Sequence, residues 1–211
     1  MTDFFDIQDA PYAVETAFPS EPERLITFAE YIESEEFGTE KHEFHNGKLY
    51  TIKGGTDKHA EILANFATAI NNALFINDDG STHVYSSDMR IRINAVNKGT
   101  YPDVTVLKGE PEYYLNAPQI ILNPTLIVEV LSKSTQKYDK GLKFDHYKTL
   151  ESFREHVLVA QDSPSVEVHF LKNRAENLWE VTTYEGLAND VTLQSIGCTV
   201  KMKQIYHRIF K

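Results

Sequence analysis

Two carboxylates stand in segments where a folded chain rarely places an acid. Glu129 lies in the middle of residues 125–131, TLIVEVL, an apolar run typical of a strand that is buried on both faces. Asp103 lies in residues 101–107, YPDVTVL, which is a second expected strand. Burying an ionised acid without a partner costs several kcal/mol, so each carboxylate must be protonated, paired with a base or bound to a cation.

Together the two acids predict a site for a hard divalent cation. Consecutive strands are usually neighbours in a sheet, so the carboxylates of Asp103 and Glu129 are expected to converge. Like charges a few ångströms apart repel each other, and a divalent cation offsets that repulsion. Carboxylate oxygens completed by waters suit Mg²⁺ or Mn²⁺ better than zinc. We therefore expect Asp103 and Glu129 to bind Mg²⁺ or Mn²⁺; the alternative is a buried ion pair between Glu129 and a lysine or arginine.

A candidate cationic group follows on a helix expected at about 136–149. Asp139, Lys143 and Tyr147 are spaced so that they share one helical face. We expect the central Lys143 to polarise the attacking water or a phosphate, with Asp139 and Tyr147 fixing its rotamer. The alternative is an ordinary surface pair between Asp139 and Lys143. Lys137 and Lys140 are alternatives to Lys143 for this role, and Lys133 lies in the break before the helix. All three are also candidates for holding nucleic-acid phosphates.

Two residues nearer the N-terminus are secondary candidates for the site. Glu43 would be a third carboxylate or would position the attacking water, and the alternative is a surface strand residue beside a turn. His59 is expected at the start of a helix, where the helix dipole lowers its tendency to be charged. It would contact a phosphate or the water of the metal, or else be a simple helix-start histidine.

The elements expected before residue 80 are two helices and a hairpin. Ser20 as N-cap, with Glu23 completing a capping box, predicts a short helix that ends near Gly38. Asn46-Gly47 predicts a tight turn, because both central residues of a type I′ turn need positive φ. The turn joins strands expected at about 41–46 and 48–53. Asp57 is expected to cap a long helix to about Asn77, with the apolar face Ile62, Phe66, Ile70, Ala73 and Leu74.

Strands dominate the rest of the chain. Met89, Ile91 and Ile93 alternate with Arg90, Arg92 and Asn94, as in a half-buried strand. In the Asp103 segment, Val104 and Val106 would face the core, and Thr105 would share the face of Asp103. Further strands are expected near 155–160, 165–170 and 178–184. Helices interleaved with strands predict an α/β or α+β fold around one central sheet.

Charge is distributed unevenly along the chain. The net charge is −10, and residues 1–43 alone hold twelve acids against two bases, so the remainder is neutral. Basic stretches at 133–148 and 201–211 could hold phosphates. The single cysteine, Cys198, excludes an internal disulfide and fits a cytoplasmic protein. No apolar run approaches ~20 residues, so we expect no membrane segment. We expect an irregular acidic leader at 1–20 and one domain at 21–211.

Four segments in order resemble a known family. They are Tyr101-Pro-Asp103, residues 123–132 (NPTLIVEVLS), residues 138–144 (YDKGLKF) with Tyr147, and residues 157–162 (VLVAQD). Together they are similar to the Uma-two family, which is grouped with restriction endonucleases in the PD-(D/E)XK nuclease superfamily. The likeness spans roughly residues 25–185, and the hairpin at Glu43 and the position of His59 also match the layout of that family.

This resemblance implies a restriction-endonuclease-like core, in which helices flank a central mixed β-sheet and an N-terminal helix and β-hairpin are added. It implies Asp103 as the "PD" acid and Glu129 as the "(D/E)" acid. The lysine of the superfamily normally falls two residues later, where this chain has Leu131, so Lys143 is expected to stand in. The implied activity is Mg²⁺-dependent hydrolysis of DNA phosphodiester bonds, by a homodimer where both strands are cut. The alternative is a catalytically inactive DNA-binding or protein-interaction module, which the missing strand lysine and the acidic leader favour.

Overall fold

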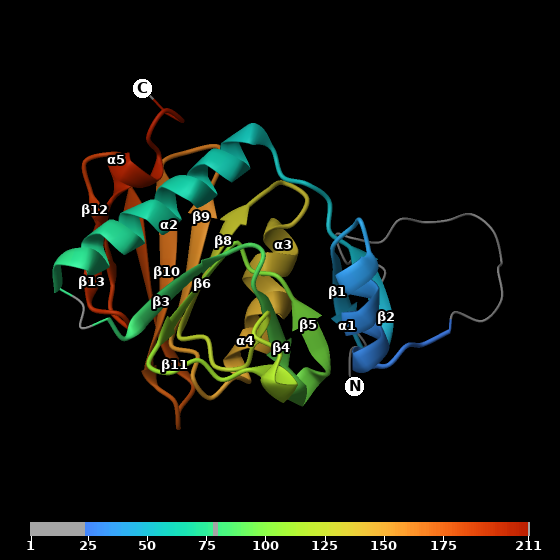
Figure 1. Ribbon diagram of the computed structural model, residues 1–211. Helices are drawn as coiled ribbons and strands as arrows, with labels where there is room; N and C mark the ends of the chain where they lie inside the picture. The colour runs from blue at the N-terminus through green and yellow to red at the C-terminus, as the bar shows by residue number, and fades with distance from the viewer. Residues whose placement is uncertain (1–23, 78–79, 211) are drawn as a thin grey trace, which may run out of the picture.

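The computed structural model describes residues 24–77 and 80–210, and two large sheets form its framework (Figure 1). The six-stranded sheet has the order β11-β10-β9-β8-β6-β3. Its strands are β3 (Thr82–Ser86), β6 (Val104–Lys108), β8 (Leu126–Leu131), β9 (Glu155–Ala160), β10 (Ser165–Asn173) and β11 (Leu178–Glu185). In this sheet β8 and β9 run parallel and the other neighbours run antiparallel. The sheet is therefore mixed.

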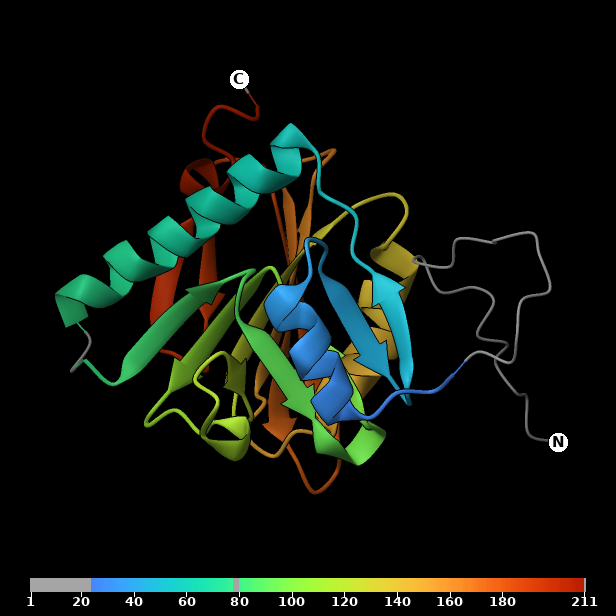
Figure 2. The same ribbon diagram turned by 45° about the vertical axis from the view of Figure 1, so that its right-hand side comes forward.

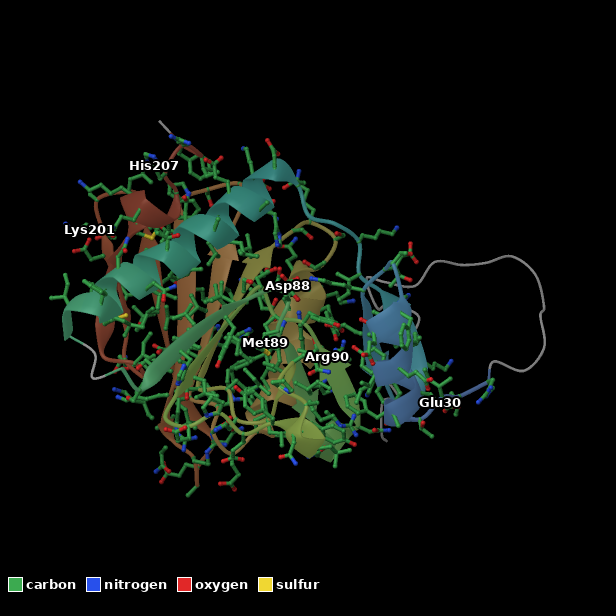
Figure 3. The ribbon with its side chains drawn as sticks, in the orientation of Figure 1. Glu30, Asp88, Met89, Arg90, Lys201 and His207 are labelled. Atoms are coloured by element: carbon green, nitrogen blue, oxygen red, sulfur yellow. The ribbon has the colours of Figure 1, made fainter. Side chains whose placement is uncertain are left out.

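The second sheet has five strands in the order β2-β1-β5-β4-β7. They are β1 (His42–His45), β2 (Lys48–Thr51), β4 (Arg90–Ile93), β5 (Lys98–Thr100) and β7 (Ile120–Ile121). A separate pair of strands, β12 (Asp190–Leu193) and β13 (Cys198–Lys201), precedes the short helix α5 (Met202–Ile205). Figure 3 places Lys201 and His207 beside α5, and Glu30 on α1 at the other side of the molecule.

Helices cover both faces of the six-stranded sheet. Helix α2 (Asp57–Asn77) crosses one face, where Ile62, Phe66 and Ile70 pack on the valines of β6, β8 and β9. On the opposite face, Ile127 packs with Phe144 and Tyr147. These two aromatic residues belong to a helical stretch made of α3 (Gln136–Tyr138), η4 (Asp139–Lys143) and α4 (Phe144–Lys148). In Figure 1 this stretch lies between the six-stranded sheet and strands β4 and β5, so it can contact both sheets.

Helix α1 (Phe28–Phe37) packs on the outer face of the five-stranded sheet (Figure 2). Phe28 and Tyr31 form a core with Phe44 of β1 and Ile120 of β7. The strand expected around Arg90 and Arg92 is present as β4, with Ile91 and Ile93 in the core beside Ile127 and the two arginines against α1, but all four of its residues are buried. The aromatic rings contributed by α1 explain this: Arg92 lies 3.8 Å above the Phe28 ring, and Arg90 lies 4.9 Å above the Tyr31 ring.

Gly99 allows β5 to approach α1 closely. A Cβ atom at this position would lie 2.7 Å from Cε2 of Phe28 and 2.8 Å from Cε1 of Tyr31. We expect Gly99→Ala to reduce the free energy of unfolding by about 1–3 kcal/mol through overpacking. Urea denaturation would measure this, with Gly54→Ala as the control, because no atom lies within 4 Å of a Cβ built there. Equal stability of the two variants would contradict the expected clash.

The N-terminal helix begins later than the sequence predicts. Its cap is Thr27, whose hydroxyl accepts from the Glu30 amide, while the Glu30 carboxylate accepts from the Thr27 amide. Residues 24–27 are not helical, and the expected cap Ser20 and the leader 1–20 lie outside the described residues.

Helix α2 has the predicted bounds, but its capping side chain is that of Thr56 rather than Asp57, since the Thr56 hydroxyl accepts from the His59 amide at 3.2 Å. The Asn46-Gly47 turn is confirmed, with φ of 50° and 88°.

The helix expected at 136–149 is interrupted. Residues Asp139–Lys143 form a π-helical turn, inside which Gly141 has φ −107° and ψ −105°. Lacking a Cβ, glycine tolerates this conformation, and the wider turn resets which side chains face the sheets. Strands β3, β5, β7, β12 and β13 are not among the strands expected from the sequence. Across the described part of the chain, no helix is both long and apolar enough to cross a membrane.

Candidate active site

The strand register places Asp103 and Glu129 opposite each other. Strands β6 and β8 are antiparallel with Val104 paired to Val128, so Asp103, directly before β6, faces Glu129 across the ladder. Asp103 is held by both of its oxygens: Oδ2 accepts from the Val130 amide at 2.7 Å, and Oδ1 lies 2.9 Å from Nε2 of His59. Its side chain is 16% exposed, so it lies at the edge of the buried site.

Glu129 is enclosed by protein. Its side chain is 4% exposed, and Oε1 accepts from Nζ of Lys143 at 2.9 Å and from the Tyr147 hydroxyl at 2.8 Å. Burial raises the pKa of Glu129 to about 8; Lys143 opposes this shift, and the nearby Asp139 and Asp103 add to it. A cation beside this carboxyl group would therefore favour its ionised form.

Lys143 lies at the centre of the carboxylates. From the end of the π-helical turn its ammonium reaches Glu129 at 2.9 Å, Asp139 at 3.6 Å and Glu43 at 3.7 Å. The surface-pair alternative is wrong, because the side chains of Lys143 and Asp139 are only 4% and 5% exposed. Asp139 contacts Lys143 as expected. The Tyr147 hydroxyl instead donates to Glu129, so Tyr147 positions the carboxylate rather than the lysine.

Glu43 reaches the same cluster from β1 of the other sheet. It is 1% exposed, so the surface-strand alternative is wrong. Oε2 accepts from Nζ of Lys98 at 2.8 Å and from the Tyr138 hydroxyl at 2.9 Å, while Oε1 accepts from the Thr100 hydroxyl. Burial acts to raise the pKa of Glu43, but Lys98 and Lys143 outweigh it and lower that pKa to about 2. Glu43 is thus an ionised partner of two lysines.

Sequence reasoning missed Lys98. This residue follows a reversal at Asn97, which has φ 47°, and it begins the three-residue strand β5. Such a short strand shows no alternation, so nothing in the local sequence marks Lys98 as buried. The one available signal was indirect, since a buried Glu43 requires a cationic partner.

His59, in the first turn of α2, forms a hydrogen bond with Asp103. Burial lowers the pKa of His59, but the hydrogen bond and charge of Asp103 outweigh burial and leave the pKa raised. The expected lowered tendency to be charged is therefore wrong, because the adjacent carboxylate has a larger effect than the helix dipole.

The sequence analysis also missed Gln161. Its side-chain amide donates to the Leu131 carbonyl at 2.8 Å and accepts from the Thr56 hydroxyl at 2.8 Å, so it connects the start of α2 to the end of β8.

Carboxyl groups outnumber lysines in this cluster. Four gather here, from Glu43, Asp103, Glu129 and Asp139, and the basic side chains that contact them are Lys98, Lys143 and His59. A divalent cation would add positive charge where Asp103 and Glu129 face each other. In residues 24–77 and 80–210, no three His, Cys, Asp or Glu side chains are grouped closely enough to hold a metal ion. Two carboxylates suit Mg²⁺, which keeps several waters and takes further ligands from substrate phosphates.

The three lysines expected to hold phosphates are all exposed. Lys137 and Lys140 lie in the same helical stretch, Lys133 lies in the turn before it, and Lys140 pairs with Glu167 at 3.0 Å. Lys133 also lines a surface hollow of about 440 Å³ beside the ends of β8 and β9, together with Ser132, Gln136 and Gln161 among others. Their role in binding nucleic acid stays a prediction.

A family model identifies the family to which this chain belongs. The Uma2 family model, described as "Putative restriction endonuclease", matches residues 28–201. Among curated proteins, the uncharacterized protein slr1290 of Synechocystis sp. is 33% identical over 89% of this chain and 95% of its own length. The uncharacterized protein sll1609 of the same organism is 34% identical over 77% of this chain and 89% of its own length.

A solved structure shares the fold. It is described as a putative nuclease belonging to DUF820 from Anabaena variabilis, and it superposes with a TM-score of 0.67 at 17% identity. The match covers 88% of this chain and 99% of that chain. The predicted mixed α+β fold with a restriction-endonuclease-like core is thereby confirmed.

Proposed function

Because this chain belongs to the Uma2 family of restriction-endonuclease-like proteins, we propose that it is a divalent-metal-dependent endonuclease that hydrolyses phosphodiester bonds in DNA. One observation carries this proposal. Asp103 and Glu129 face each other across neighbouring strands, and Lys143 lies 2.9 Å from Glu129 although it comes from a helix. The proposal takes these two acids and this lysine as a PD-(D/E)XK-like site in which Lys143 replaces a lysine at the position of Leu131.

Asp103 and Glu129 would hold the metal, Mg²⁺ or Mn²⁺, through carboxylate oxygens. When bound, such an ion supplies a water of lowered pKa and neutralises phosphate charge. The chain fixes both carboxylates in advance: His59 and the Val130 amide hold Asp103, and the Tyr147 hydroxyl holds Glu129. Preorganised groups of this kind cost no rearrangement when charge develops in the reaction.

Lys143 would act on the reacting phosphate or the attacking water. Its amine is buried, where electrostatic interactions are stronger than in water, and it lies within 4 Å of the carboxyl groups of Glu43, Glu129 and Asp139. From this position it would donate to a non-bridging phosphate oxygen and stabilise the negative charge that grows there. Asp139 would hold the ammonium in place from 3.6 Å.

DNA would approach over the exposed side of the lysine-bearing stretch. Lys137 and Lys140 on this stretch and Lys133 in the turn before it would contact backbone phosphates, which carry no sequence information. Contacts of this kind make binding weaker as salt rises. Cutting both strands of a duplex would require a second site, as a homodimer provides.

A catalytically inactive DNA-binding or protein-interaction module is the second candidate. The observation that favours it is Leu131, which occupies the strand position where the superfamily carries its lysine. In that case Asp103, Glu129 and Lys143 would form a charge cluster that stabilises the fold without cutting. Metal-dependent cleavage separates the two candidates.

The test is a plasmid-nicking assay with added Mg²⁺ or Mn²⁺ and with EDTA. We expect nicked or linear DNA from the wild type only when metal is present. Asp103→Ala and Glu129→Ala, purified in parallel, report contaminating nuclease. Cutting by the wild type that does not exceed these two variants would remove the endonuclease proposal and leave the binding module.

A further inference from the structure

A second buried lysine, Lys98, contacts the same carboxylate of Glu43 that lies near Lys143. The side chain of Lys98 is 2% exposed, and its ammonium donates to Glu43 at 2.8 Å and to the Tyr138 hydroxyl. It enters from β5 of the five-stranded sheet, on the face opposite α1. Lys98 contacts neither Asp103 nor Glu129 through any hydrogen bond or ion pair recorded for the described residues, so it would affect the site through another group.

Glu43 is that group. Its two oxygens face different lysines: Oε2 contacts Lys98 at 2.8 Å, and Oε1 lies 3.7 Å from Lys143. Lys143 is closer to Glu129, at 2.9 Å. Glu43 and Glu129 therefore both attract the same ammonium. Lys98 neutralises Glu43 at hydrogen-bond distance, which weakens the attraction of Glu43 for Lys143.

The pairing of β1 with β5 in the five-stranded sheet brings Glu43 and Lys98 together. Phe44 of β1 pairs with Gly99 of β5, so Glu43 faces Thr100 directly, and the Thr100 hydroxyl donates to Glu43. Behind Gly99, the rings of Phe28 and Tyr31 prevent β5 from shifting outward. Lys98 and Glu43 thus form a fixed support, against which the end of the π-helical turn is packed.

We propose that Lys98 is a positioning residue for the candidate nuclease site: by neutralising Glu43 it leaves Lys143 directed at Glu129 and at the metal and phosphate beside it. This inference rests on the proposed function. The N-terminal helix and the hairpin would then contribute to catalysis, because the hairpin carries Glu43 and the helix packs against β5. Lys98 acts through Glu43 and need not contact the substrate.

The first test measures how the effect of Lys98 depends on Glu43. We expect Lys98→Met to lower kcat of metal-dependent cleavage by about 10- to 100-fold, the range of a misdirected catalytic group, with KM little changed. The double variant K98M/E43Q removes the competing charge and should recover most of that loss. Lys98→Arg, which retains the charge, should recover part of it.

Lys172→Met is the matched control, because Lys172 forms an exposed pair with Glu180 at 3.0 Å. If K98M fails to fold, the comparison of E43Q with K98M/E43Q replaces it, since removing Lys98 should not slow E43Q further. A double variant as slow as K98M, or slower than E43Q, would overturn the proposal.

The second test does not depend on cleavage. In a crystal structure of K98M we expect Nζ of Lys143 to lie at hydrogen-bond distance from Glu43 and to have moved away from Glu129. If K98M fails to fold, the structure of K98R is determined instead, and there we expect Lys143 to remain hydrogen-bonded to Glu129. A K98M structure in which Lys143 stays on Glu129, or a K98R structure in which it moves to Glu43, overturns the positioning role even if the wild type cuts DNA. Conversely, a wild type that does not cut while Lys143 moves as expected in K98M refutes the proposed function and leaves the charge relation intact.

Discussion

Replacing Lys143 with methionine is expected to reduce metal-dependent cleavage by about 10²- to 10⁴-fold, the range for loss of a positioned group that transfers or stabilises a proton or charge. Methionine fills most of the volume of the lysine stem and removes only the ammonium. The variant should fold, because Glu129, whose pKa is already raised to about 8, can remain protonated when its cationic partner is lost. Single-turnover cleavage of a labelled duplex would measure the rate.

Lys140→Met is the matched control for that experiment. Lys140 lies three residues before Lys143, but its side chain is 43% exposed and pairs with Glu167. We expect K140M to weaken DNA binding slightly and to leave the single-turnover rate nearly unchanged. K143M should still bind Mn²⁺ by calorimetry, because both carboxylates remain. A K143M enzyme as fast as the wild type would exclude the relocated lysine and direct attention to Lys133 and Lys137.

The sequence predicted the positions of those site residues that follow from short-range patterns. The apolar run around Glu129 and the valines after Asp103 identified two strands, and the rule that consecutive strands are neighbours placed the two acids together. Helical spacing joined Asp139 to Lys143, and their contact at 3.6 Å agrees with it. In each case the information lies within a few residues or in one strand pairing.

The positions of site residues that depend on the five-stranded sheet could not be predicted in this way. Glu43 is buried because β1 pairs with β5, more than fifty residues later in the chain, and no local pattern encodes that pairing. The π-helical turn is equally hidden, since Gly141 permits it but does not require it. Tyr147 therefore contacts Glu129, where simple helical spacing directed it to Lys143. Long-range pairing and helix irregularity set the details of this site.

Glu129→Gln is expected to change the pH dependence of stability. The pKa of Glu129 is about 8 in the folded protein against 4.5 ordinarily. Below the lower value both states hold the proton, and between the two values the folded state binds more protons than the unfolded state. The free energy of unfolding of the wild type should therefore fall as pH rises through this window and level off above it. Glutamine does not titrate, so this part of the pH dependence disappears.

At about pH 9 and without metal, E129Q should exceed the wild type by on the order of a few kcal/mol, and near pH 4 the two should be similar. Urea denaturation in EDTA at a series of pH values would measure the difference. Subtracting the two curves removes the contributions of other titrating groups such as Asp139 and His59. If Glu129 instead formed a purely structural ion pair, E129Q would be less stable than the wild type at every pH at which Glu129 is ionised, because Lys143 would lose its closest partner.

Adding Mg²⁺ extends the same experiment to the metal site. A cation that binds only the folded state stabilises it in proportion to the logarithm of its concentration over Kd. The wild type should gain stability with Mg²⁺, most strongly above the pKa of Glu129, where the carboxylate no longer needs to lose a proton to bind. E129Q and Asp103→Asn should gain little, since each removes one charged ligand. An equal gain in all three proteins would place the ion elsewhere and separate Asp103 and Glu129 from metal binding.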